Sequence, residues 1–308
     1  MARYRRDDNG WWQRGHSNWK ITPLSVFPFI LDSPRVVSRH YLGASSFRLW
    51  LLLTFFLFLP VPSALAQQPF YTDDADVTDY KKFHLQFSDE YDVLQRFDYP
   101  SLRQNTSVLE VGYGLAKNLE VSVNGPLIGI TNSRIITPRN VIGLGDIEVQ
   151  IKYNPFKEHE GSRMPALAAT FAIEFPTGST ERGLGSGLAD YFLNGIIQKS
   201  VTKKTKLRLN GGVLFAGNEA TGEIGIKTRG TVFVGGASVV KQFTPKLDLG
   251  AEVTGALTRA FQLDQGQVQT QIGGNYQITK KMSFDFGAVA GRFNTARLGV
   301  QLGVSVDF

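Results

Sequence analysis

The chain ends in the stretch LGVQLGVSVDF, from Leu298 to Phe308, which alternates without a break between apolar side chains and small or polar ones. Successive side chains of an extended strand point to opposite faces, so all the apolar residues of this stretch share one face. The other face carries glycine, glutamine, serine and aspartate. The stretch therefore predicts a β-strand that separates an apolar environment from a polar one.

The same two-residue period recurs along the chain, for example in Ile147 to Tyr153, Leu207 to Phe215 and Leu247 to Thr254. We count about twelve such runs, each near ten residues long, which is the length that a tilted strand needs to cross a bilayer. The runs are 82–93, 106–115, 119–128, 143–154, 165–176, 188–200, 205–216, 229–241, 246–258, 266–277, 282–292 and 297–308.

The connections between the runs are alternately short and long. The short turns are 116–118, 202–204, 244–246 and 279–281, with a longer connection at 154–163, and the loops are 94–105, 129–142, 177–187, 217–228, 259–265 and 293–296. In outer-membrane barrels the short turns face the periplasm and the long loops face outward. The sequence therefore predicts an all-β fold, a transmembrane antiparallel up-and-down β-barrel of about twelve strands in the bacterial outer membrane.

A soluble β-sandwich or a lipocalin-like barrel is the competing architecture, because such folds also alternate with a period of two. A soluble barrel, however, directs its charged side chains outward into water. The polar faces here contain many Gly, Gln, Asn, Ser and Thr residues and few Lys residues. This composition favours a crowded wet lumen over a solvated exterior.

The N-terminal quarter of the chain is predicted to lie outside the barrel. The apolar run Leu49 to Leu59, followed by small residues up to Ala66, predicts a signal peptide over 48–66 and therefore export. Residues 1–47 are an N-terminal extension that points to a translation start assigned too far upstream. Residues 67–81 are expected to form a periplasmic lead-in, and the barrel to span 82–308. Without residues 1–66 the chain keeps 25 basic and 24 acidic residues, which argues against a nucleic-acid partner.

Charged residues on the polar faces are the candidate lumen-lining residues. They are Glu110, Glu120, Asp146, Glu148, Lys152, Asp190, Arg208, Asp248, Glu252 and Asp285. Two roles stay open for them: they set the ion preference of a channel, or they pair with one another and fill a narrow lumen.

The loop 129–142 is unusually apolar for a segment in water. Its candidate gate residues are Ile130, Ile135, Ile136, Val141 and Ile142. The loop either folds into the mouth of the barrel as a gate or packs against the rim.

Three further sequence patterns could indicate a calcium site, a phosphate-binding loop or a lipase site. The acidic segment Tyr71 to Asp79 lacks the glycine and the distal glutamate of a calcium-binding loop, so a solvated segment is expected. Neither Gly143 to Asp146 nor Gly183 to Gly187 opens a helix, so neither predicts a phosphate loop. A lipase site would need a serine beside a histidine, and only His84 and His159 follow the signal peptide. We expect no enzyme activity, no cofactor and no bound metal.

From about Phe70 to Phe308 the chain resembles the MetA-pathway of phenol degradation family of transporter-like barrels. The resemblance rests on several short motifs. They are Pro69 to Ala75, Gly143-Leu144-Gly145-Asp146, Glu174 to Gly178, Gly185-Ser186-Gly187 before Asp190-Tyr191, and Gly303 to Phe308. The resemblance implies an outer-membrane barrel that admits small, hydrophobic or aromatic compounds, and it implies no particular binding residues.

The combined prediction is an outer-membrane channel or transporter for passive passage of small solutes, with hydrophobic or aromatic compounds among them. The alternative is a structural or surface-interaction barrel with a filled lumen. The expected partners are outer-membrane lipid, small-molecule solutes, and the barrel-assembly machinery, which would contact the C-terminal strand ending at Phe308.

Overall fold

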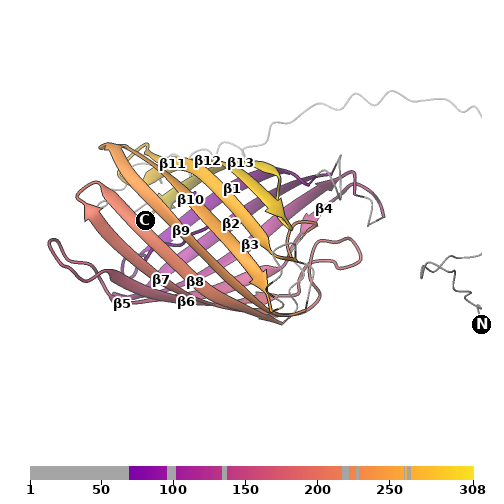
Figure 1. Cartoon of the computed structure of the whole chain (residues 1–308), viewed down its shortest axis with the longest axis horizontal. Helices are drawn as coiled ribbons and strands as arrows, with labels where there is room; N and C mark the ends of the chain where they lie inside the picture. The colour runs from indigo at the N-terminus through magenta and orange to yellow at the C-terminus, as the bar shows by residue number, and fades with distance from the viewer. Residues whose placement is uncertain are drawn as a thin grey trace, which may run out of the picture. The chain divides into compact units, whose positions relative to one another are not determined.

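The computed structural model describes residues 69–95, 102–133, 137–216, 222–226, 229–259, 261 and 265–308. The predicted extension over 1–47 and the predicted signal peptide over 48–66 lie outside these residues. Antiparallel strands follow one another along the described chain and wind around a common axis (Figure 1). They are β1 (Phe83–Val93), β2 (Arg103–Ala116), β3 (Leu119–Thr131), β4 (Val141–Leu144), β5 (Ile147–Phe156), β6 (Ala166–Phe175), β7 (Asp190–Thr202), β8 (Thr205–Ala216), β9 (Gly230–Thr244), β10 (Leu247–Thr258), β11 (Gln267–Gln277), β12 (Met282–Phe293) and β13 (Leu298–Asp307).

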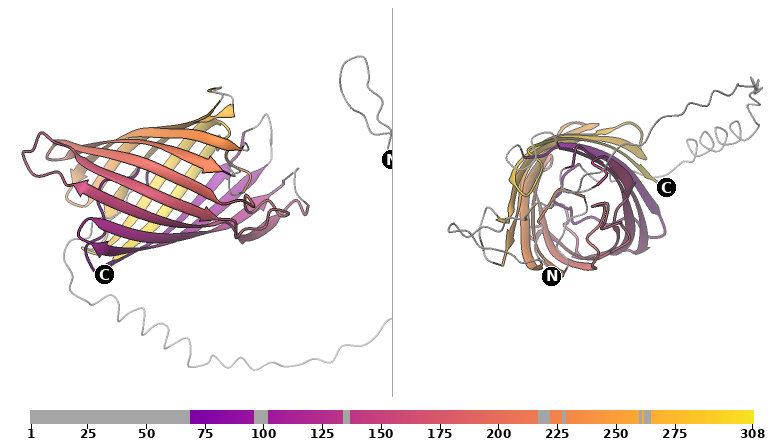
Figure 2. Two further views of the ribbon diagram at one scale, coloured as in Figure 1. Left: turned by 90° about the horizontal axis from the view of Figure 1, so that it is seen from below. Right: turned by 90° about the vertical axis from the view of Figure 1, so that its right-hand side faces the viewer.

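The sheet closes into a barrel because β1 pairs with both β13 and β2, and β2 pairs with β3. At the seam, Phe83 and Phe308 exchange backbone hydrogen bonds of 2.8 and 3.0 Å. Viewed along its axis, the sheet forms a ring (Figure 2, right). The predicted antiparallel barrel of about twelve strands is confirmed, and Phe308 lies at the end that carries the short turns.

One predicted strand is divided in two. The run expected over 143–154 corresponds to the end of β4 and most of β5, which pair with successive parts of β3. Between them, Gly145 leaves the regular ladder and donates its N–H to Pro126 O at 2.8 Å. The barrel therefore has twelve strands plus the short extra strand β4 at its long-loop end.

The wall has an apolar outer face, as a lipid environment requires. Outward-pointing residues such as Phe87, Leu209 and Ile272 are each at least half exposed and lie on different strands. A polar exception is Asp89, whose carboxylate accepts hydrogen bonds from Asn105 and Ser107 on the neighbouring strand β2. Among the described residues, no helix is both long and apolar enough to cross a membrane.

Candidate functional site: a plugged lumen with an internal chamber

The segment before β1 runs inside the barrel. We call residues 69–80 the N-terminal arm. Its backbone N–H groups at Tyr71 and Thr72 each donate to the β10 carboxylate of Glu252 at 2.9 Å. Farther along, the N–H of Thr78 donates to Glu120 of β3 at 2.6 Å. The arm therefore contacts lumen side chains on widely separated parts of the wall, and it follows the barrel interior rather than the periplasm.

The expectation of a solvated segment is wrong for the middle of the arm, whereas Tyr71 and Tyr80 stay about half exposed. Thr72 is only 2% exposed and Ala75 is fully buried. Glycines in the wall leave room for this close approach. A β-carbon on Gly114 would lie 2.0 Å from the carbonyl oxygen of Asp79, and one on Gly250 would lie 2.9 Å from the ring of Phe70. Side chains at these wall positions would collide with the arm.

Two basic side chains of the wall clamp the acidic part of the arm. Lys152 Nζ of β5 lies 2.7 Å from Asp73 and 3.3 Å from Asp74, and Arg208 of β8 lies 3.4 Å from Asp74. Burial alone would raise the pKa of Asp74, but the positive charges of Lys152 and Arg208 hold that pKa below its usual value. The acidic segment therefore pairs with basic side chains of the barrel wall.

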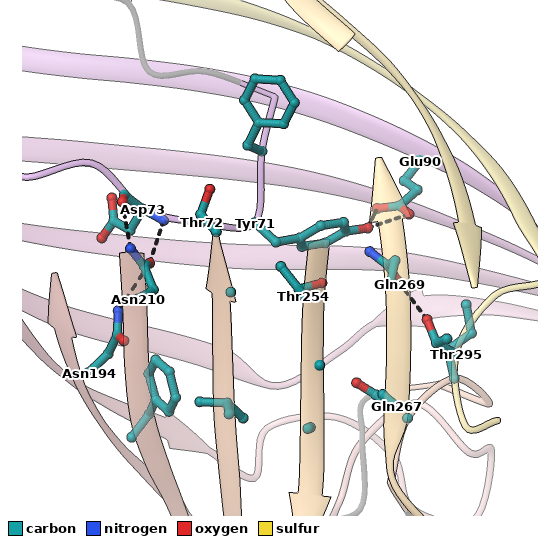
Figure 3. A pocket seen from close by; sticks show the side chains of 18 of the residues that line it. Tyr71, Thr72, Asp73, Glu90, Asn194, Asn210, Thr254, Gln267, Gln269 and Thr295 are labelled. Carbon is teal, nitrogen blue, oxygen red and sulfur yellow. Dashed lines mark hydrogen bonds between the residues drawn. The ribbon is translucent and has the colours of Figure 1, made fainter. Parts of the chain in front are cut away.

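Above the arm the lumen widens into a cavity of about 570 Å³, here called the chamber. The arm contributes its floor through Phe70 to Asp73 (Figure 3). On the arm side, Tyr71 donates its hydroxyl to Glu90 at 2.5 and 2.6 Å, and Asn210 accepts from the N–H of Asp73 at 2.7 Å. Most remaining wall positions are amides, hydroxyls and glycines, which keep the space polar and wide.

The outward mouth of the lumen is filled by an apolar cluster. Its buried members lie on lumen-facing positions or on loops that fold inward, and they are Leu94, Leu102, Ile128, Ile130, Val141, Leu184 and Ala296. Ile224 packs against this cluster and also lines the chamber. The cluster, which we call the mouth cluster, therefore forms the roof of the chamber.

The predicted gate loop is shorter than the sequence suggests. Ile130 belongs to β3, and Val141 and Ile142 belong to β4, because the two strands pair here and continue the wall outward. Ile130 and Val141 enter the mouth cluster, whereas Ile142 points outward and is 63% exposed. Ile135 and Ile136 lie outside the described residues.

A different loop reaches into the mouth. The N–H of Glu223 donates to the side chain of Gln104 at 2.8 Å, and Ser133 donates to Glu223 at 2.5 Å. These contacts bring the β8–β9 connection over the chamber. The sequence offered only one signal for this role, the apolar Ile224 and Ile226 within a glycine-rich loop.

The ten predicted lumen-lining residues fall into groups with different contacts. Lys152, Arg208, Glu120 and Glu252 hold the arm. Glu110 lines the chamber. Glu148 accepts from Asn124 at 3.0 Å, and Asp285 accepts from Asn275 and Ser305. Asp190 is buried opposite Glu174, and Asp248 lies opposite Asn275 on the polar face of β10.

Asp146 has a role that its sequence position does not suggest. Its two carboxylate oxygens accept the backbone N–H groups of Gly178 at 2.8 Å and Ser186 at 2.7 Å. Because it sits between β4 and β5, it anchors the β6–β7 loop at the outward end. The Gly-Leu-Gly-Asp motif is therefore a loop anchor.

His84 is the histidine considered for a lipase site. Its Nδ1 lies 2.6 Å from Asp307 of β13, at the seam of the barrel. Its Nε2 is buried and has no hydrogen-bond partner in the described part of the chain, where a lipase would present a serine hydroxyl. The contacts of His84 join the first and last strands.

A closed barrel with an apolar outer face, a polar lumen and alternating short turns and long loops defines the class of bacterial outer-membrane β-barrels. The model of the family described as "Putative MetA-pathway of phenol degradation" matches residues 68–308, so the chain belongs to that family. This confirms the resemblance found in the sequence motifs. No curated protein sequence matches the chain.

The chain is also similar to several solved structures at low sequence identity. The NanC porin has a TM-score of 0.51 and 11% identity, over 72% of this chain and 98% of its own. The KdgM porin has a TM-score of 0.48 and 12% identity, over 73% and 99%. The CymD monoaromatic hydrocarbon channel has a TM-score of 0.38 and 9% identity, over 74% and 88%.

Proposed function

We propose that this protein is an outer-membrane channel for passive passage of small solutes, and that hydrophobic or aromatic compounds are among them. The observation that carries this proposal is the position of the mouth cluster. Its apolar side chains point into the lumen at the outward end, and through Ile224 they adjoin the chamber. A porin for hydrophilic solutes has a polar, water-filled interior at this level.

The size and lining of the chamber fit such solutes. Cavities of roughly 300–1,000 Å³ take small organic molecules, and this one has about 570 Å³. Phe70, Phe192 and Val234 give it apolar surface, and burial of apolar solute surface is favourable by about 25 cal/mol per Å². The family description, which refers to phenol degradation, supports the aromatic class.

In this account the arm controls the periplasmic side. It lies below the chamber and is held by Lys152, Arg208 and Glu252, so a solute leaves toward the periplasm only when the arm shifts. The outward loops and the chamber select the solute, and the arm sets how often the path opens.

Flux into proteoliposomes tests the proposal. The probes are labelled phenol and labelled maltose. An outer leaflet of lipopolysaccharide slows the direct passage of phenol through the lipid, and protein-free vesicles give the background uptake of each probe. We expect protein-dependent uptake of phenol to exceed that of maltose at least about tenfold. Equal uptake of both would indicate a general porin, and no protein-dependent flux of either would overturn the channel.

The second candidate function is a structural or surface-interaction barrel with a filled lumen. One specific observation favours it: the arm occupies the inner part of the lumen and the mouth cluster occupies the outer part. This candidate predicts a lumen that passes neither solute, and partner binding that depends on the outward loops 129–142 or 217–228.

We also propose the barrel-assembly machinery as a partner through the C-terminal strand. Phe308 directly follows β13 at the rim with the short turns, and its ring stacks on that of Phe83 with the ring centres 6.1 Å apart. An assembly assay with Phe308→Ala, which removes the terminal ring, should show slower barrel formation.

A further inference from the structure

The chamber has two chemically different walls. On one side, β1 and β2 present the carboxyl groups of Glu90, Asp92 and Glu110. On the other side, β7 and β9 present Phe192 and Val234, and Phe70 of the arm lies between the walls on the floor. Among the described residues that line the chamber there is no lysine, arginine or histidine. The space is therefore negative along one wall, and the other wall carries apolar side chains among its amides, hydroxyls and glycines.

Glu90 and Asp92 converge on one point of this acidic wall. They stand two residues apart on β1, so both side chains face the lumen. The opposing residue on β13 is Gly299, and a β-carbon there would lie 2.3 Å from Asp92 Oδ1 and 3.5 Å from Glu90 Oε1. The absence of a side chain at Gly299 thus makes the space in which the two carboxyl groups approach each other.

The two carboxyl groups differ in how they are satisfied. Glu90 accepts the hydroxyl of Tyr71 (Figure 3). Asp92 is only 3% exposed, lines the chamber, and its Oδ1 has no hydrogen-bond partner in the described part of the chain. A buried polar atom without a partner is costly, and two adjacent carboxylates without a cation repel each other. Both costs are removed by one positively charged donor placed between them.

We propose that the chamber is a binding site for small organic cations, whose protonated amine lies between Glu90 and Asp92 and whose apolar body rests against Phe70 and Phe192. An ammonium group offers three donors, which suits the two carboxyl groups and the buried Oδ1 of Asp92 that has no partner in the described part of the chain. Phe70 and Phe192 offer contacts that an organic body uses and a fully hydrated metal ion does not. This inference rests on the proposed function and narrows its solute class to aromatic or aliphatic amines.

Equilibrium binding to the purified full-length protein, measured by calorimetry, tests the site with three probes of similar size. They are benzylammonium, benzyl alcohol and benzoate, which share a ring and differ in charge. We expect benzylammonium to bind at least about tenfold more tightly than benzyl alcohol, and benzoate to give no measurable binding. Asp92→Asn and Glu90→Gln keep the shape of the site and should each weaken benzylammonium binding at least about tenfold without changing benzyl alcohol binding.

Asp248→Asn is the matched control, because Asp248 lies on the polar face of β10 but does not line the chamber. It should leave all three affinities unchanged, and the heat-dependent electrophoretic mobility of folded barrels checks that each variant folds. Equal binding of benzyl alcohol and benzylammonium would overturn the cation site. It would not contradict the proposed channel for aromatic solutes. Failure of all three probes to bind would count against both the cation site and the proposed channel for aromatic solutes.

Discussion

Replacement of Lys152 should release the N-terminal arm from the lumen. Lys152 is almost fully buried and neutralises Asp73 and Asp74 at 2.7 and 3.3 Å. Lys152→Met keeps most of the side-chain volume but leaves the two arm carboxylates without their nearest cation. Removal of one partner from a buried ion pair costs about 3–5 kcal/mol. Because about 1.4 kcal/mol corresponds to a factor of ten, the undocked population should rise about 100- to 4,000-fold.

Thiol labelling measures this population directly, because the chain contains no cysteine. Val77→Cys places one thiol in the arm at a position that is 8% exposed. In this background, Lys152→Met should accelerate maleimide labelling about 100- to 4,000-fold. Lys206→Met is the matched control: Lys206 lies 3.7 Å from Asp76 in a partly exposed pair, which is worth about 0–1 kcal/mol. An unchanged rate in Lys152→Met, or an equal rise in both variants, would refute the clamp.

Two further predictions concern the arm and the outward loops. Since the pKa of Asp74 is lowered in the docked arm, its contribution to docking is present above its usual pKa of about 3.9 and is lost as the pH falls through the lowered value. The protection that Asp74 adds to the arm, measured by amide exchange as the difference between the wild type and Asp74→Asn at each pH, should therefore be constant between pH 8 and 5 and be lost only below about pH 4; loss of this difference between pH 7 and 5 would contradict this sign. Asp146→Ala leaves the N–H groups of Gly178 and Ser186 without their acceptor, which costs about 1–3 kcal/mol locally. Trypsin should then cleave after Arg182 about 5- to 150-fold faster, and an unchanged cleavage rate would remove the anchor role.

The wall of the barrel could be predicted from the sequence because its chemistry alternates with the strand period. Successive residues of a strand face lipid and the lumen in turn, so they have to be apolar and polar in turn. The alternation is therefore present in nearly every strand. The prediction was weaker at strand ends. β2 begins at Arg103, three residues before the expected start, because Arg103, Gln104 and Asn105 show no alternation of apolar and polar side chains and are fixed by pairing with β3.

The arm could not be predicted from its own residues. Pro69 to Asp79 have no periodicity and are rich in aspartate, and such a segment is expected in water when it is considered alone. Its burial is decided by Lys152 and Arg208, which lie on other strands more than 70 residues away. A usable signal did exist: two basic side chains were predicted to face a narrow lumen and needed acidic partners, and the densest acidic segment stands directly before the first strand.

The arm also constrains the order of assembly. It precedes every strand in the chain, yet its hydrogen-bond partners follow by 42 residues at Glu120 and by 202 residues at Gln271. Contacts between such distant parts of a chain form late, because the intervening loop has to be closed first. A barrel interrupted before β11 would lack part of the surface on which the arm docks. Protection of the arm therefore reports that the wall is complete, and the first described residues of the protein are among the last to reach their native place.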